Sequence, residues 1–287
     1  MKCIKGAIYS MFLLVVLMAC HKRNKKPSRL VDSRYDMGNP ILLKLPNDLN
    51  GISGISYYQK DSTLFAIVDD DGLFFKIPLN TKDKVKSWRF DSSHDFEDIA
   101  RIDSIFYVLV SNGNIETIRF NKTDSIFTTI TNFPDSAKKN NEFESLFLDD
   151  SSHNLMLICK KCEDDQKKIV SAWEFNPNTK QYTHSAYSID MSPVEGNLGE
   201  NKARLKPSGA AVNPLSGDIY VLAAVNHLLL ITGHDGKIKE FFKLDPAIYE
   251  QPEGITFVPN GDMIISNESH KGSSATILII KNKKKGS

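Results

Sequence analysis

The sequence predicts an all-β protein, and three observations support this class. From residue 41 onward the 287-residue chain lacks the hydrophobic period of 3.6 that marks amphipathic helices. Short runs of β-branched and aromatic residues recur instead, separated by turns rich in Asn, Asp, Gly and Ser. These runs repeat in sets of four strands, which is typical of the blades of a β-propeller. We therefore expect one propeller domain over residues 41–287.

The first residues predict an export signal that ends at a lipid attachment site. Lys2 and Lys5 precede an apolar run, Met11 to Ala19, that is shorter than the ~20 residues needed to span a bilayer. Small residues then precede Cys20, as in the cleavage and acylation site of bacterial lipoproteins. We expect residues 1–19 to be a signal peptide and Cys20 to carry a lipid that anchors the protein to a membrane. An ordinary cleaved signal and an uncleaved anchor are the alternatives.

Residues 20–40 predict the lipidated cysteine followed by a flexible linker, because they show no apolar period. Basic residues after the cysteine either contact anionic head groups or simply keep a spacer soluble. No acidic stretch of the kind that marks surface export follows Cys20, so we expect the protein to face the periplasm.

The chain has 36 basic and 35 acidic residues, and this balance argues against nucleic acid as a partner.

The strand Ile41–Leu45 stands alone before the first repeat. The last repeat ends after its third strand, near Lys281, so this early strand is predicted to supply the missing fourth strand. Pairing of the two chain ends would close the ring and remove exposed sheet edges.

Five blocks follow, each with a similar opening. The openings are Ser53-Gly54-Ile55, Glu97-Asp98-Ile99, Glu144-Ser145-Leu146, Ser208-Gly209-Ala210 and Glu253-Gly254-Ile255. Most lie about 44 to 47 residues apart, within the ~40 to 50 residues of a propeller blade. The third interval is longer because it holds a polar insertion, Met191 to Leu205. We expect five four-stranded blades, with six as the alternative if the insertion contains strands.

Cys159 and Cys162 are the other cysteines expected in the exported chain, where oxidation is permitted. Residues three apart on a straight strand point to opposite faces, so a disulfide requires a turn at Lys160-Lys161. No helix follows this Cys-x-x-Cys motif, which argues against redox catalysis. A structural disulfide or two free thiols are the remaining possibilities.

Three of the five openings place a glutamate first: Glu97, Glu144 and Glu253. The innermost strands of a propeller line its channel, so these side chains should converge at one mouth, with Ser53 and Ser208 in the other two blades. Converging carboxylates repel each other unless their pKa values rise or a cation neutralises them, and Ca²⁺ prefers such oxygen ligands. The alternative is that the acids accept N–H bonds at turns and stay solvated.

A second acidic set follows the second strands: Asp69, Asp70 and Asp71 in the first block and Glu268 in the last. The sequence does not place these acids at the same mouth, and turn residues are the simpler interpretation. The histidines lack the short spacing of a zinc site, and no nucleophile elbow or phosphate-binding loop occurs.

The order of these openings resembles the SdiA-regulated family of exported bacterial β-propellers. The similarity also includes Ile-Val-Asp-Asp-Asp-Gly after the first hairpin and Ile-Ile-Ser-Asn-Glu-Ser near the end, and it covers roughly residues 41–281. Gluconolactonase, strictosidine synthase and phytase-like propellers share the short motifs more distantly. The resemblance implies a calcium-capable propeller with Glu97, Glu144 and Glu253 on its functional face. The Asp-Asp-Asp-Gly hairpin and the Cys-Lys-Lys-Cys-Glu segment depart from the family pattern.

Two functions fit these features. The first is a non-catalytic, membrane-anchored protein that binds Ca²⁺ and an envelope ligand or partner at the acidic mouth. The second is a Ca²⁺-dependent hydrolase of a lactone or phosphate ester, with one of the three glutamates as general base. Against the second, the openings carry no Lys or Arg beside the glutamates, and Arg204 and Lys206 are the nearest basic residues. We favour the binding function.

Overall fold

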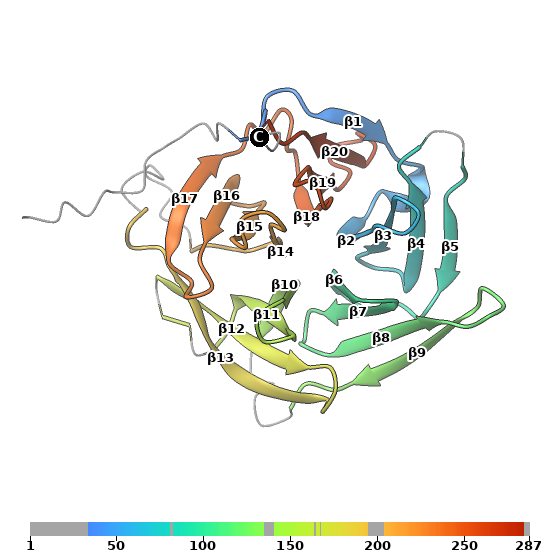
Figure 1. The fold of residues 1–287 in the computed structure, drawn as a ribbon, viewed down its shortest axis with the longest axis horizontal. Coiled ribbons are helices and arrows are strands. Elements are labelled where there is room, and N and C mark those ends of the chain that lie inside the picture. Colours follow the sequence, from blue (N-terminus) through green and yellow to red (C-terminus); the bar gives the residue numbers. More distant parts are fainter. Residues whose placement is uncertain are drawn as a thin grey trace, which may run out of the picture.

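The computed structural model describes residues 34–80, 83–134, 141–163, 165–166, 168–194 and 204–283. These residues form five four-stranded antiparallel sheets arranged around a central axis (Figure 1). The described part of the chain contains one short 3-10 turn, η1 (Asn47–Leu49), beside its strands. The five-bladed β-propeller predicted from the repeats is confirmed. The expected signal peptide and Cys20 lie outside the described residues.

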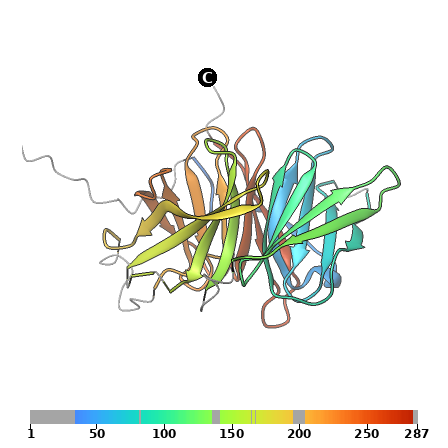
Figure 2. The ribbon, with the colours of Figure 1, turned by 90° about the horizontal axis from the view of Figure 1, so that it is seen from below.

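Each blade runs from an inner first strand to an outer last strand, so the repeats follow one another around the ring (Figures 1 and 2). Blade 1 contains β2 (Ile52–Tyr58), β3 (Thr63–Val68), β4 (Leu73–Pro78) and β5 (Lys86–Arg89). Blade 2 contains β6 (Phe96–Ile102), β7 (Ile105–Val110), β8 (Ile115–Phe120) and β9 (Ile126–Thr131). Blade 3 contains β10 (Glu142–Asp149), β11 (Asn154–Lys161), β12 (Ile169–Asn176) and β13 (Gln181–Asp190). Blade 4 contains β14 (Gly209–Val212), β15 (Ile219–Ala223), β16 (Leu228–Thr232) and β17 (Ile238–Lys243).

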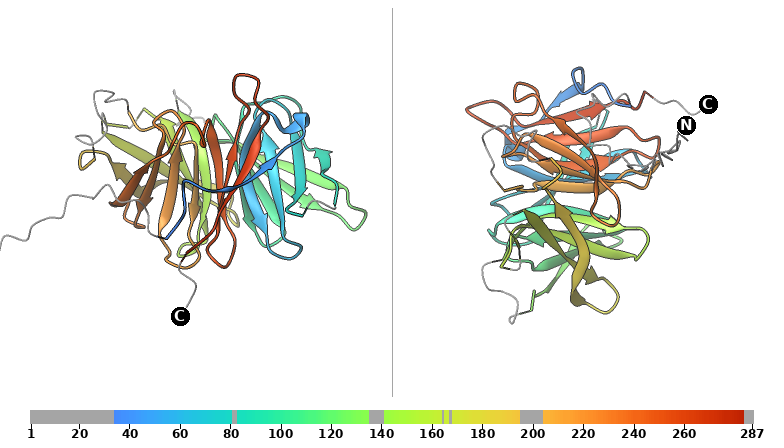
Figure 3. Two further views of the ribbon diagram at one scale, coloured as in Figure 1. Left: turned by 90° about the horizontal axis from the view of Figure 1, so that it is seen from above. Right: turned by 90° about the vertical axis from the view of Figure 1, so that its left-hand side faces the viewer.

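Blade 5 joins the two ends of the domain. It contains β18 (Pro252–Phe257), β19 (Met263–Asn267), β20 (Thr276–Ile280) and, as its outer strand, β1 (Ile41–Lys44). β1 pairs antiparallel with β20, with Ile41 opposite Ile279 and Lys44 opposite Thr276. Figure 3 shows the early strand lying beside the last strands of the chain. The predicted closure by the strand before the first repeat is confirmed.

Packing starts before β1, inside the segment expected to be linker. Tyr35 is 1% exposed, and its backbone forms a bridge with Asn282. The Tyr35 hydroxyl donates to the Gly261 carbonyl at 2.7 Å and accepts from Asn213 Nδ2 at 2.8 Å. The propeller therefore includes residues from Tyr35 onward, because one large aromatic side chain fills a space beside blades 4 and 5.

The hydrophobic core lies between neighbouring blades. Every residue of β3, β15 and β19 is buried, because a second strand has a blade on either side. A strand that is buried on both faces has a continuous apolar sequence rather than an alternating one. This explains the runs LFAIV in β3 and IYVLA in β15.

No helix in the described ranges is long and apolar enough to cross a membrane.

Candidate functional site

Residues from all five blades surround a pocket of about 250 Å³ at one end of the axis. Glu97, Glu144 and Glu253, the glutamates singled out in the sequence, all line this pocket, as do Ser53 and Ser208. We call the pocket the acidic mouth, and define it by its six carboxylate residues: Asp69, Asp95, Glu97, Glu144, Glu253 and Glu268. Two basic residues, Lys160 and Lys206, complete its charged lining in the described part of the chain.

A β-bulge positions each of the three glutamates. Phe96 and Asp98 pair with the adjacent residues Val110 and Leu109, so Glu97 is an extra residue on β6. The same register shift leaves Glu144 extra on β10 and Glu253 extra on β18. A bulge redirects the side chain of the extra residue and breaks the alternation of the strand. This geometry turns all three carboxylates toward the mouth.

The serines at the matching positions link blades. Ser53 Oγ donates to the Glu97 carbonyl of blade 2 at 2.6 Å. Ser208 Oγ donates to the Pro252 carbonyl of blade 5 at 2.7 Å. The two blades that lack a first glutamate thus use a short hydroxyl to fix a neighbouring first strand.

Asp69 and Glu268 also belong to the mouth, although the sequence did not place them there. The Asp69 N–H donates to the Gly51 carbonyl at 2.9 Å, and the Glu268 N–H donates to the Gln251 carbonyl at 2.9 Å. These matching bonds hold the residue after each second strand next to the start of the first strand. The antiparallel pairing of first and second strands therefore brings both acidic sets to the same end of the propeller.

Lys160 was missed in the sequence analysis, which found no basic residue beside the glutamates. Its Nζ forms an ion pair with Glu144, whose side chain is 11% exposed. Cys159 pairs with Phe143 while Lys161 pairs with Glu142, so Lys160 is the extra residue of a bulge on β11. The sequence did contain a signal for this position, because a disulfide between Cys159 and Cys162 requires a turn at Lys160-Lys161. Such a turn redirects the Lys160 side chain. Arg204 instead pairs with Asp165, outside the mouth.

Burial and mutual repulsion perturb the mouth carboxyls. Burial, followed by the charge of Asp95, raises the pKa of Glu97 to about 8, while Lys160 and a hydrogen bond from Ser111 oppose the rise. Burial and Glu268 raise the pKa of Glu253 to about 7. Burial and Asp69 likewise raise the pKa of Glu268 to about 7. Burial thus favours the protonated forms of these three carboxyls, and a bound cation would favour their ionised forms.

Asp98, the residue after Glu97, links the first strands of neighbouring blades. It is 2% exposed, and its carboxylate accepts the N–H groups of Ile99 and Leu146 at 2.8 Å each and also that of Ala210. These donors belong to blades 2, 3 and 4. A Cβ on Gly54 would lie 2.5 Å from Asp98 Oδ1, so glycine is required where blade 1 faces the carboxylate.

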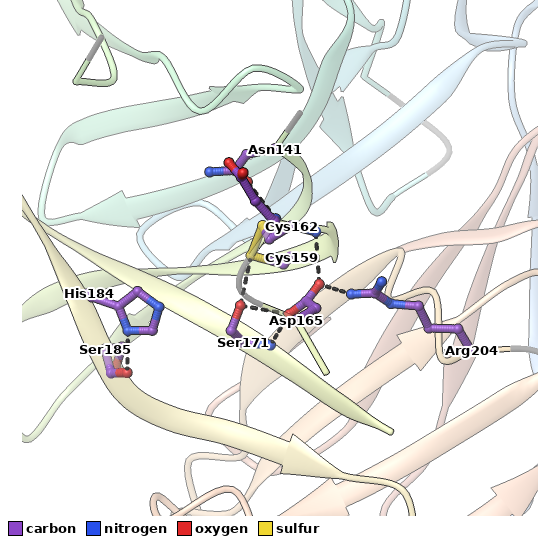
Figure 4. The surroundings of a disulfide bond; sticks show 9 residues. Asn141, Cys159, Cys162, Asp165, Ser171, His184, Ser185 and Arg204 are labelled. Atoms are coloured by element: carbon purple, nitrogen blue, oxygen red, sulfur yellow. Dashed lines mark hydrogen bonds and ion pairs between the residues drawn. A yellow bond between two sulfur atoms is a disulfide. The ribbon is translucent and has the colours of Figure 1, made fainter. Parts of the chain in front are cut away.

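The structure joins Cys159 and Cys162 in a disulfide with Cα atoms 5.7 Å apart. Figure 4 shows Asp165 beneath it, accepting from the Cys162 N–H at 2.8 Å and from Ser171 Oγ at 2.6 Å. Arg204 pairs with the same carboxylate. The bulge at Lys160 is the turn that such a disulfide requires, so the cross-link and the lysine's position share one cause.

The mouth offers oxygen donors suited to a hard cation, but these are not gathered around one point. In the described ranges, the one group of three possible ligand atoms lying within 4.8 Å of one another is Cys159, Cys162 and Asp165. Its two sulfurs are used in the disulfide and provide no thiolate. The mouth carboxylates would have to move inward to share one ion, and Glu144 would have to leave Lys160.

A second pocket of about 430 Å³ opens beside the mouth and shares Ala224, Val225 and Glu253 with it. Gln251 connects the two: its Nε2 donates to Glu268 at 3.1 Å, and its Oε1 lies 2.7 Å from His270 Nδ1. The two pockets together provide room for a ligand larger than an ion.

Comparisons with known proteins agree with this architecture. The sequence profile of the SdiA-regulated family matches residues 43–271. No curated protein sequence matches the chain significantly. Among solved structures, glutaminyl cyclase of Myxococcus xanthus is similar at a TM-score of 0.59 and 12% identity, covering 85% of this chain and 95% of that one.

Two other solved structures are similar at the same level. Regucalcin of Agrobacterium tumefaciens, described as a calcium-binding protein, has a TM-score of 0.51 and 11% identity, covering 88% of this chain and 95% of that one. The pyrroloquinoline quinone-bound aldose sugar dehydrogenase of Streptomyces coelicolor has a TM-score of 0.51 and 11% identity, covering 85% and 98%. At such identities the similarity establishes the propeller fold alone.

Proposed function

The chain belongs to the SdiA-regulated family, and from that premise we propose that it binds Ca²⁺ and a further cell-envelope ligand at the acidic mouth without catalysing a reaction. The observation that carries this proposal is the excess of acidic over basic residues in the acidic mouth. Six acidic residues face two lysines there, and burial together with neighbouring carboxylates raises the pKa values of Glu97, Glu253 and Glu268. A divalent cation with oxygen ligands would supply positive charge and favour the ionised forms of these carboxyls.

Glu97 and Glu253 are the first proposed ligands, because the charge of Glu253 acts on Glu97. Asp69 and Glu268 act on Glu253 in the same way and are further candidates. Glu144, also expected as a ligand from the sequence, would join them once Lys160 releases it. Ca²⁺ tolerates six to eight oxygen ligands in irregular geometry, so inward movement of these side chains is compatible with its chemistry. The neighbouring pocket would then receive a ligand that also contacts the ion.

The first test is thermal unfolding of the full chain with Ca²⁺ and with chelator. Binding to the folded state alone stabilises it by about 2.7 kcal/mol at a hundred times Kd, so we expect a clear rise in Tm. Combined Glu97→Gln and Glu253→Gln should abolish the rise. Combined Asp103→Asn and Asp150→Asn removes two charges at hairpin tips outside the mouth and should preserve it. A rise that survives in the glutamine variant would refute the site.

We further propose that a lipid on Cys20 holds the propeller at a membrane, facing the periplasm. The apolar run before Cys20 and the basic residues after it support this proposal. Cys20→Ala should move the expressed protein from the membrane fraction to the soluble fraction. Retention of the variant in the membrane fraction after equal processing would exclude lipid anchoring through this residue.

A hydrolase is the second candidate, and Lys160 favours it. The mouth contains Lys206, which the sequence had indicated as a nearby basic residue, and Lys160, which it had not. Glu97 and Glu253 have pKa values suited to proton transfer near neutral pH. A screen for esterase, lactonase and phosphatase activity in Ca²⁺ separates the two proposals. Activity that Glu97→Gln abolishes would establish the hydrolase, whereas calcium binding without activity would leave the binding function.

A further inference from the structure

A second site lies on the side of the propeller, between blades 1 and 2. It is a pocket of about 510 Å³, and none of its lining residues lines the acidic mouth. Five aromatic side chains contribute to it: Tyr58, Phe65, Trp88, Phe106 and Phe120. Its volume falls within the range of about 300 to 1,000 Å³ that small-molecule sites occupy.

The aromatic rings contact one another and form one continuous surface. Phe65 and Phe106 are 3% and 2% exposed, and their centroids lie 4.4 Å apart across the boundary between the blades. Trp88 on β5 and Phe120 on β8 are partly exposed and meet edge-on at 4.9 Å. The Trp88 indole N–H donates to the Asp124 carbonyl at 2.8 Å, and this hydrogen bond holds the Trp88 ring in place. A planar apolar group would therefore meet a preformed surface, which lowers the ordering cost of binding.

Two lysines face the same pocket. Lys76 on β4 pairs with Phe65 on one side and with Lys86 of β5 on the other, and directly opposed residues share a face of the sheet. Lys76 Nζ lies 5.7 Å from the Phe65 ring centroid. Both lysines line the pocket, and like charges opposite each other on a sheet are unfavourable.

The carboxylates near these lysines are accessible to water. Lys76 pairs with Asp61, and Lys86 pairs with Asp124 at 3.2 Å, where both side chains are more than 60% exposed. The Lys86–Asp124 pair is exposed and therefore weak, so an incoming anion can replace it. The Lys76–Asp61 pair is less exposed, at 28% and 38%, so there the anion would bind beside the pair. An anion between the two ammonium groups would also relieve their mutual repulsion.

We infer that this pocket binds a small planar aromatic anion, a carboxylate or sulfonate whose ring packs against Trp88 and Phe120 and whose charge lies between Lys76 and Lys86. Aromatic stacking supplies the apolar part of such recognition, and charge-assisted hydrogen bonds supply the polar part. The site is independent of the acidic mouth, so its failure would leave the calcium proposal untouched.

Two probes with the same ring system test the inference on the full chain. Anilinonaphthalene sulfonate carries the negative charge, and phenylnaphthylamine lacks it. The chain has two tryptophans, and Trp173 packs against Phe133 in blade 3, away from the pocket. In Trp173→Phe, energy transfer from Trp88 to the bound sulfonate should be strong. In Trp88→Phe, transfer from Trp173 should be weak.

Charge is tested separately. Combined Lys76→Gln and Lys86→Gln should raise the Kd of the sulfonate about tenfold and leave that of phenylnaphthylamine unchanged. Combined Lys44→Gln and Lys243→Gln, which alters two exposed lysines outside the pocket, should change neither Kd. Equal energy transfer from both tryptophans would place the probe elsewhere, and an equal loss for both probes would overturn the role of charge.

Discussion

At the scale of single residues, Glu116 is a buried acid outside the mouth. It is 1% exposed and is hydrogen-bonded to Asp91. Burial, followed by the interaction with Asp91, raises its pKa from 4.5 to about 8. Between those values the folded chain holds a proton that the unfolded chain has released. Stability from this group is therefore lost as pH rises through that interval.

Glu116→Gln removes the proton linkage while retaining a side chain of similar shape. We expect the variant to exceed the unchanged protein in free energy of unfolding at about pH 9, by on the order of 2 kcal/mol, and to differ little at about pH 5. Urea unfolding at both pH values measures this difference. Glu163→Gln, at an exposed acid, is the matched control. A difference that is the same at both pH values would show that Glu116 does not titrate in this interval.

The residues of the mouth show what a sequence can and cannot reveal about a site. Glu97, Glu144 and Glu253 were identifiable because the repeat puts them at equal places in three blades. Lys160 was not, because its direction depends on a bulge that inserts one residue into β11. Asp69 and Glu268 needed the register between first and second strands, which short motifs do not specify.

At the scale of elements, β11 combines a bulge, a disulfide and a lysine in the mouth. The disulfide closes a very short loop, so its effect on the unfolded chain is small, about 2 kcal/mol. We expect reductant to lower the urea midpoint of the unchanged protein by the equivalent of that energy. Combined Cys159→Ala and Cys162→Ala should have a lowered midpoint that reductant no longer changes. Reductant-insensitive unfolding of the unchanged protein would contradict a disulfide in the folded state.

At the scale of the whole molecule, blade number and ring closure were predictable while the domain boundary was not. Blade number follows from periodicity, and closure follows from a repeat that lacks one strand at its end and has one spare at its beginning. The boundary depends on Tyr35, a single aromatic residue with no periodic neighbours to identify it. Its two hydrogen bonds to distant loops arise from tertiary packing alone.

Closure by β1 gives a prediction for the complete ring. A chain starting at residue 34 keeps Tyr35 and β1, whereas one starting at residue 46 exposes the edge of β20 and loses the packing of Leu43 and Leu45 against blade 5. We expect the longer chain to unfold at the same temperature as the full protein. The shorter one should have a lower Tm and associate as its concentration rises, because unpaired strand edges template intermolecular pairing. A synthetic peptide of residues 34–45 should restore both properties by binding as the missing strand. If the two truncated chains melt alike, β1 does not hold the ring closed.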